Sequence, residues 1–149
     1  MTTGTEHIVG GHLTVRIVTP EATAYEGKAD MVVVPSHDGE TAFLPRHAAF
    51  VGLLGAGECR FHVPDGGMHH FFLAGGVVQV VDDVVTVLAE TVVPAAALDP
   101  AKAEREFEAA SALPGGDADK SAARDKAVTI ARAKRRVATK LAALPGGRH

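Results

Sequence analysis

The sequence predicts an all-β sandwich of about ten short strands, followed by an antiparallel α-helical hairpin. The first observation is a pair of β-branched runs, 77–81 and 84–88, which follow Gly75-Gly76 and flank Asp82-Asp83. β-Branched side chains fit a pleated surface, and a polar turn between two apolar runs is typical of a β-hairpin. We expect this hairpin to form the centre of the sandwich. The second observation is that turn residues recur about every eight to twelve residues before it, as in sandwiches and barrels.

The strands before this hairpin are predicted from alternation and from turn residues. Residues 13–18 alternate apolar and polar side chains, which indicates a half-buried strand after a loose leader over residues 1–12. Gly39 and the run 64–67 mark tight turns. The remaining strands are expected over residues 22–26, 29–35, 41–44, 48–54, 58–63 and 68–73.

The pattern changes after Pro94, and this change predicts two units, residues 1–93 and residues 94–149. Asp99 is a suitable N-cap and Pro100 suits the first helical position. A first helix therefore starts here and ends at residues 114–117, and a second covers about 119–144. Their inner faces are mostly alanine, and a buried methylene contributes only about 0.8 kcal/mol, so the hairpin is expected to dock weakly and to move. The expected inner residues are Ala103, Phe107, Ala110, Ala123, Ala127, Ile130, Val137 and Leu141.

Composition excludes several classes of protein. Cys59 is the only cysteine among 149 residues, so an internal disulfide and a cysteine-based metal cage are excluded. The N-terminus lacks the apolar segment of a signal peptide, and no apolar run approaches the roughly 20 residues that cross a bilayer. His69 and His70 are adjacent in a strand and point to opposite faces, so they do not chelate a metal together. His7, His12 and His149 lie near the termini, and no metal site is expected.

The residues that catalysis requires are also missing. The glycine-rich run 52–57 lacks the Lys-Ser/Thr and the helix of a phosphate-binding loop, so it predicts a turn between strands. No serine stands in a pattern with histidine and aspartate, and Cys59 has no evident base. We therefore expect no active site.

Charge divides the chain unevenly. Residues 1–119 hold 6 Lys/Arg and 17 Asp/Glu, whereas residues 120–149 hold 9 Lys/Arg and a single acidic residue. The basic segment can be a solvated helix face or a surface for an acidic protein. Nucleic acid is the less favoured ligand, because no aromatic stacking residues accompany the charges. The basic residues of interest are Arg132, Lys134, Arg135, Arg136 and Lys140.

Four motifs in this order resemble one known family. They are residues 13–21 (LTVRIVTPE), 37–48 (HDGETAFLPRHA), the Gly-Gly hairpin with 85–91 (VTVLAET), and 98–103 (LDPAKA). Together they resemble the epsilon subunit of the F-type proton-translocating ATP synthase, over roughly residues 13–144.

The resemblance implies a non-catalytic subunit of the central stalk. In that family the sandwich binds the gamma subunit and touches the membrane c-ring. The helical hairpin either lies on the sandwich or extends along gamma toward the alpha and beta subunits, where it inhibits ATP hydrolysis and meets an acidic segment of beta. The implied location is peripheral, at the cytoplasmic face of the plasma (inner) membrane within the complex. The implied c-ring contacts are Asp38, Glu40, Thr41, Ala42, Phe43 and His47.

Two positions depart from the family pattern. Members commonly have Pro-Gly-His-Ala-Pro where this chain has Arg46 and Ala49 at the second and fifth positions. Some members bind ATP through a motif that here is represented by Asp99, Lys102 and Ala103, with lysine in the place of arginine. Lysine is a point charge and does not replace the planar arginine fork at a phosphate, so no cofactor and at most weak ATP binding are expected.

Two other functions compete with this interpretation. The chain can be a free-standing β-sandwich adaptor with a basic helical tail, and an enzyme of small molecules is a more distant alternative. Co-purification separates the first two, because a stalk subunit is recovered with gamma and the catalytic ring and an adaptor is not.

Overall fold

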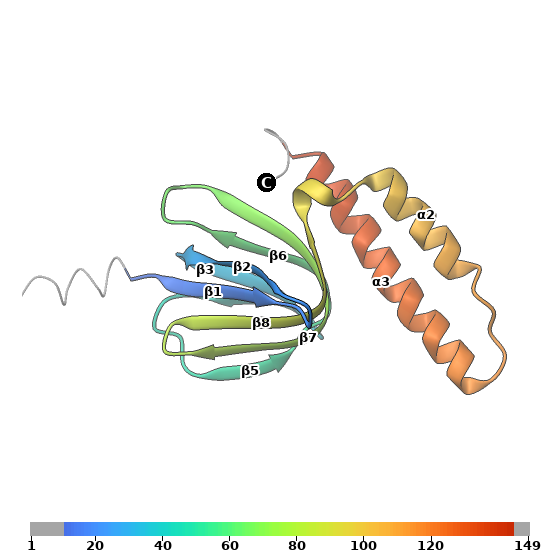
Figure 1. Ribbon diagram of the computed structural model, residues 1–149, viewed down its shortest axis with the longest axis horizontal. Helices are drawn as coiled ribbons and strands as arrows, with labels where there is room; N and C mark the ends of the chain where they lie inside the picture. The colour runs from blue at the N-terminus through green and yellow to red at the C-terminus, as the bar shows by residue number, and fades with distance from the viewer. Residues whose placement is uncertain (1–10, 145–149) are drawn as a thin grey trace, which may run out of the picture.

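A computed structural model describes residues 11–144 and shows eight strands followed by two α-helices (Figure 1). A short 3-10 helix, η1 (Ala95–Ala97), connects the strands to the helices α2 (Pro100–Ser111) and α3 (Ala118–Ala142). The strands are β1 (Leu13–Val18), β2 (Thr23–Ala29), β3 (Met31–Ser36), β4 (Gly39–Phe43), β5 (Phe50–Leu53), β6 (Ala56–His62), β7 (Met68–Val81) and β8 (Val84–Pro94).

The predicted Gly-Gly hairpin is confirmed as the centre of the fold. β7 and β8 lie in the middle of the order β2-β1-β8-β7-β6-β3-β4, and β5 pairs with β7. The first half of β7 pairs with β6, its second half pairs with β5, and the first half of β8 pairs in parallel with β1. Both long strands therefore run through the two layers of the sandwich.

The strand count differs from the expectation because one predicted break is a bend. Gly75 and Gly76 were expected to separate two strands, but both lie inside β7, with φ of 73° and 113°. A Cβ at Gly76 would lie 1.9 Å from the carbonyl oxygen of Leu88, so the two strands approach too closely for any side chain here. The pairing with β8 keeps one register on both sides of the bend. Residues 11–144 thus form eight strands and not about ten.

The turn between the two long strands is a two-residue loop. Asp82 and Asp83 both have positive φ, 49° and 63°, while Val81 pairs with Val84. Positive φ at both central residues is typical of the type I′ turn, whose twist matches that of the flanking strands. The conformation of this turn therefore explains why Asp82 and Asp83 stand between the two strands.

The sandwich core is formed by the inward residues of both layers. Three phenylalanines, Phe43, Phe61 and Phe71, pack with aliphatic residues of β1, β3, β7 and β8, and Cys59 is enclosed among them. Successive side chains of a strand point to opposite faces, so the residues between these core residues lie on the outer face of each layer. The remaining core residues are Leu13, Val15, Ile17, Ala29, Val32, Val34, Leu54, Val63, Leu73, Val78, Val80, Val85, Val87 and Ala89.

Both helices begin at the aspartates that cap them. The Asp99 carboxylate accepts a hydrogen bond from the Ala101 backbone N–H at 3.0 Å, and Asp117 accepts one from Lys120 at 2.8 Å. These bonds satisfy backbone donors that a helix leaves free at its first turn. The N-cap predicted at Asp99 is confirmed.

The helical hairpin packs on the outer side of the sandwich through a second cluster. Phe72 and Ala74 of β7 meet small residues of the helices there. Two inner-face expectations need correction: Ala123 is exposed, and Phe107 is only half buried, because the distal half of the hairpin extends away from the strands (Figure 1). The other members of the cluster are Ala95, Leu98, Ala103, Ala133, Val137, Ala138 and Leu141.

No helix within residues 11–144 is both long enough and apolar enough to cross a membrane. His7, His149 and most of the expected leader lie outside the described residues. The division at residues 93 and 94 stays a prediction, although β8 ends at Pro94 and only helices follow.

Candidate interaction surfaces

An apolar row crosses four strands on the outer face of one layer. Leu53 of β5 pairs with Val77, Val77 with Leu88, and Leu88 with Val18 of β1. Paired residues on adjacent strands share a face, so the four side chains form one row. Leu53 is 65% exposed and Leu88 is 45% exposed, so the row presents contiguous apolar side chains to solvent. We call these four residues the apolar row.

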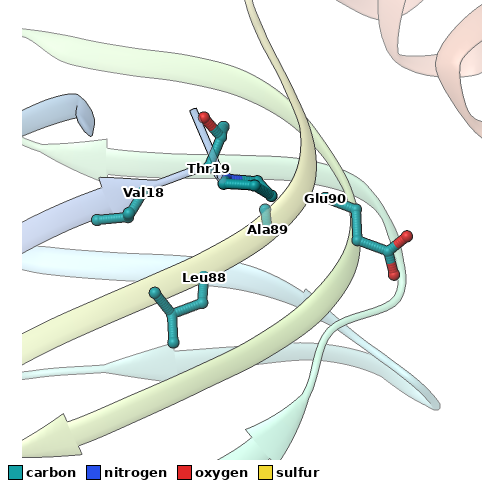
Figure 2. A pocket seen from close by; sticks show the side chains of 6 residues that line it. Val18, Thr19, Leu88, Ala89 and Glu90 are labelled. Carbon is teal, nitrogen blue, oxygen red and sulfur yellow. The ribbon is translucent and has the colours of Figure 1, made fainter. Parts of the chain in front are cut away.

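A shallow cleft lies at the β1 end of this row (Figure 2). It has a volume of about 230 Å³ and is formed where Thr19 and Pro20 leave β1 beside Leu88 and Ala89 of β8. Glu90 lies at its edge, and its carboxylate points away from Leu88 (Figure 2). The cleft is therefore an apolar depression with one acidic residue beside it.

The residues expected to contact a c-ring lie around the β3–β4 turn. Asp38, Glu40, Ala42 and His47 are exposed, and Thr41 is half exposed, so their contacts stay predictions. Phe43 is a correction: its side chain is completely buried in the sandwich core, because it is the inward residue at the end of β4.

Arg46 and His47 shape the loop after β4. Arg46 has φ of 64°, a left-handed conformation that favours glycine, and this explains why glycine is common here in the family that the sequence resembles. The Arg46 backbone N–H donates to the Asp83 carboxylate at 2.6 Å, which fixes the loop against the β7–β8 turn. The His47 ring packs edge-on against Phe43, with centroids 5.1 Å apart.

Glu40 is held by Arg60 across the sheet. The Arg60 guanidinium donates to both Glu40 oxygens, at 2.8 and 3.2 Å. This hydrogen bonding, more than the opposing effect of burial, holds the pKa of the Glu40 carboxyl below its usual range. The pair joins β4 to β6.

Sequence analysis missed the group of side chains around Glu58. The Glu58 side chain is only 4% exposed and lies on the face of β6 that α3 covers. Its carboxylate accepts hydrogen bonds from His70 Nδ1 at 2.6 Å and from Lys140 Nζ at 2.7 Å, and Arg60 lies at 3.4 Å. Burial by itself raises the pKa of this carboxyl, but Lys140 and His70 outweigh burial and hold it below its usual range.

A partial signal for this group was present in the sequence. Glu58 and Arg60 flank Cys59 in a strand, so the alternation placed both charges on one face. Nothing in the local sequence showed that α3 would cover that face with Lys140, which lies 82 residues after Glu58.

Three of the five basic residues that the sequence analysis selected in α3 form ion pairs within the chain. Lys134 pairs with Glu106 at 2.9 Å, Arg135 with Glu104 at 3.2 Å, and Lys140 with Glu58. The Arg135 guanidinium also lies 3.8 Å from the centre of the Phe107 ring, which explains how that ring is half covered. Arg132 and Arg136 are exposed, and within residues 11–144 neither forms an ion pair. The charges are therefore more fully compensated than their crowding in sequence implied.

The residues expected at a nucleotide site have structural roles here. Asp99 caps α2, and Ala103 is buried between the hairpin and the sandwich. Lys102 is exposed. The structure does not gather these three side chains around a common cavity among those found in the described part of the chain.

Metal-binding and thiol chemistry have no support in the described residues. No group of three His, Cys, Asp or Glu side chains within residues 11–144 could hold a metal ion. Burial raises the pKa of the Cys59 thiol to about 12, so this cysteine is unreactive in the folded protein. His69 stacks on Phe61, whereas His70 binds Glu58, which confirms that the two histidines point to opposite faces.

Comparison with known proteins agrees with the fold and the motifs. Residues 12–95 match the family described as "ATP synthase, Delta/Epsilon chain, beta-sandwich domain". The chain is 42% identical to the ATP synthase epsilon chain of Thioalkalivibrio sulfidiphilus over 123 residues, which are 81% of this chain and 87% of the relative. It is 35% identical to the epsilon chain of Rhodopirellula baltica over 120 residues, 80% of this chain and 93% of the relative.

Solved structures share the fold at low sequence identity. A chain of the Euglena gracilis mitochondrial ATP synthase (OSCP/F1/c-ring) has a TM-score of 0.72 at 19% identity, over 81% of this chain and 78% of that one. A chain of the Tetrahymena thermophila mitochondrial ATP synthase (central stalk/c-ring) has a TM-score of 0.63 at 14% identity, over 85% and 96%. With 84 residues matched by the family and with relatives aligned over most of their length, the chain belongs to the ATP synthase epsilon chain family.

Proposed function

We propose that this protein is a non-catalytic central-stalk subunit of a proton-translocating ATP synthase. The sandwich binds the gamma subunit through the apolar row, and the β3–β4 turn faces the c-ring. The subunit is peripheral, attached through the complex to the cytoplasmic face of the plasma membrane. Family membership and the two structural neighbours, both chains of ATP synthases, support the complex. The apolar row supports the binding surface.

The apolar row is the observation that carries this proposal. Exposed leucines on adjacent strands form a continuous apolar surface, whereas single exposed leucines are ordinary. The cleft between Thr19 and Leu88 extends the row and offers space for an apolar side chain of gamma. We assign gamma as the partner that covers the apolar row, because the family resemblance implies that the sandwich of an epsilon subunit binds gamma.

The helical hairpin is proposed to regulate ATP hydrolysis. In this structure it lies on the sandwich, with Arg132 and Arg136 facing solvent. If the hairpin extends, the ion pairs of Lys134 and Arg135 stay within the hairpin, whereas Lys140 leaves Glu58. Lys126 also leaves Glu90, which it contacts at 3.8 Å. Extension therefore adds two free cations to Arg132 and Arg136, and this basic surface suits the acidic segment of the beta subunit.

ATP is proposed to bind weakly or not at all. The capping role of Asp99 and the burial of Ala103 leave Lys102 alone to meet a phosphate, and one exposed lysine is a poor nucleotide site. No cofactor is assigned to the subunit.

Co-purification with gamma tests the proposal. Leu53→Asp combined with Leu88→Asp places two charges in the apolar row, and we expect recovery of gamma to fall at least tenfold. Leu113→Asp is the matched control, because this leucine is 44% exposed in the turn between the helices. Slow alkylation of Cys59 and unchanged circular dichroism confirm that the variants are folded.

Two results would contradict the proposal. Equal recovery of gamma by the row variant and by the control would show that gamma binds elsewhere. Failure of the wild-type chain to recover gamma and the catalytic ring would favour the alternative function, a free-standing adaptor with a basic tail.

A further inference from the structure

We propose that Lys140 and Glu58 form an anchor that holds the helical hairpin on the sandwich, and that Glu40 sets the strength of this anchor through Arg60. A cationic group of a partner that binds Glu40 therefore loosens the hairpin. The coupling lies within this chain and does not depend on which complex the chain joins.

The anchor follows from the position of Glu58. Glu58 and Phe72 are paired on β6 and β7, and Phe72 belongs to the cluster beneath the hairpin, so both side chains face α3. A buried carboxylate requires a charged or hydrogen-bonding partner, because burial removes its water. Lys140 provides the shortest cationic contact from α3, at 2.7 Å. When α3 leaves, Glu58 loses this partner and its cover together.

The apolar contacts of the hairpin with the sandwich are weak enough that one ion pair can affect the stability of docking. Five of the nine buried residues in the cluster beneath it are alanines. Two open spaces, one lined by Ala127 and Ala131 and one by Lys126 and Thr129, also lie between α3 and the strands and share Ile130. Lys126 also contacts Glu90 of β8 there, but at 3.8 Å and with both side chains largely exposed. The middle of α3 is therefore loosely packed, and the firm contact is at its C-terminal end, where Lys140 lies.

Arg60 links the anchor to the surface of the sandwich. It is shared between two carboxylates, with contacts of 2.8 and 3.2 Å to Glu40 and a longer contact of 3.4 Å to Glu58. Arg60 and Lys140 approach the same oxygen, Oε1 of Glu58, whereas His70 binds Oε2. The two cations thus compete for one acceptor, and Glu40 holds Arg60 back from it.

The sign of the coupling follows from this competition. If Glu40 loses its charge or binds another cation, Arg60 moves its hydrogen bonds to Glu58 and compensates that carboxylate without help from α3. Lys140 then contributes less to compensating the charge of Glu58, and the docked state of the hairpin is less favoured. Glu40 is exposed, at 50% for its side chain, so a partner can reach it. By reciprocity, a docked hairpin makes Glu40 a weaker site for that cation.

A distance measurement on the full chain tests the anchor. Nitroxides at Leu113→Cys, in the turn between the helices, and at Asp65→Cys, in the β6–β7 turn, report the position of the hairpin by electron–electron resonance. Cys59 is completely buried and is not labelled. Lys140→Met is expected to raise the undocked fraction at least tenfold. Arg136→Met is the matched control, an exposed cation one turn earlier on α3, and is expected to leave the distances unchanged.

Two further variants separate the anchor from its relay. Glu40→Gln is expected to raise the undocked fraction at least threefold, whereas Glu26→Gln, which removes the exposed partner of Arg16, is the control without effect. Glu58→Gln added to Lys140→Met is expected to restore docking in part, because no buried charge remains.

Each expectation can fail separately. Unchanged distances in Lys140→Met would overturn the anchor. Unchanged distances in Glu40→Gln, in a protein that Lys140→Met opens, would overturn the relay. Rapid alkylation of Cys59 in a variant would reveal an unfolded sandwich, and the same comparison is then made with Lys140→Gln and Glu40→Ala, which also remove the charges.

Discussion

The two cores of this protein differ in the size of the side chains that form them. The sandwich core buries eighteen hydrophobic residues, of which two are alanine, whereas the core beneath the hairpin buries nine, of which five are alanine. A fully buried Val, Leu or Phe contributes about 1.5–3 kcal/mol, and an alanine methyl contributes far less. The hairpin is also the region whose docking involves a buried charge. The comparison teaches that one chain combines a firmly packed scaffold with a weakly attached arm.

The largest expected effect is in the sandwich. Phe61→Ala removes a completely buried ring from the core and should lower the free energy of unfolding by about 3–5 kcal/mol. Phe107→Ala is the matched change in the hairpin, where the ring is only half buried, and should cost much less. Urea denaturation followed by circular dichroism measures both. Equal losses would break the comparison between the two cores.

A smaller and more local effect is expected beneath the hairpin. Leu141→Ala removes the largest aliphatic side chain that α3 buries completely, and should cost about 2–3 kcal/mol, within the range for buried leucines. We expect trypsin to cleave α3 at least tenfold faster while the sandwich stays resistant and Cys59 stays unreactive. If the sandwich became sensitive as well, the two regions would be a single cooperative unit.

Low pH should weaken the docking of the hairpin more than it weakens the sandwich. The folded state holds the pKa of Glu58 below its ordinary value of 4.5, so its charged form stabilises docking above that value. This stabilisation is lost as the pH falls below 4.5 through the lowered pKa. The sandwich core contains no charged side chain, and on its surface Glu40 also has a lowered pKa, so the sandwich should lose less stability than the docked hairpin over the same range. The nitroxide distances, recorded from pH 6 to pH 3, should show undocking that Glu58→Gln makes flatter; an identical pH profile in that variant would assign the change to other carboxyls.

The smallest effect is expected at the strained point of the sandwich. Arg46→Gly relieves a left-handed backbone conformation, but glycine also gains conformational freedom in the unfolded chain. The two terms oppose each other, and the free energy of unfolding should change by less than about 1 kcal/mol. Thermal denaturation measures it. A larger loss would show that the arginine side chain itself contributes to the fold.

Much of the scaffold could be predicted from local sequence. The turn at Asp82-Asp83, the N-cap at Asp99 and the strand at residues 13–18 each depend on a few neighbouring residues, and all three are confirmed. Gly75-Gly76 was misjudged because glycine both ends strands and bends them. Only the close approach of Leu88, from the partner strand, decides between the two.

The candidate surfaces were less accessible to sequence reasoning. The apolar row requires the register of four strands, and the partners of Glu58 come from three separate elements. Five basic residues of α3 were selected, but the acidic partners of three of them on α2 and β6 were not recognised, because ion pairs across a fold leave no periodic signal.

The two long strands also have a mechanical consequence. Because β7 and β8 run unbroken from one layer into the other, the layers are joined by peptide bonds as well as by contact between their inner faces. A force that pulls the layers apart along these strands is carried by the two continuous backbones, and the β7–β8 hydrogen bonds hold the two strands in one register. The hairpin is attached to the far end of β8 and lies outside this path (Figure 1). The path that joins the two layers therefore does not include the helical hairpin.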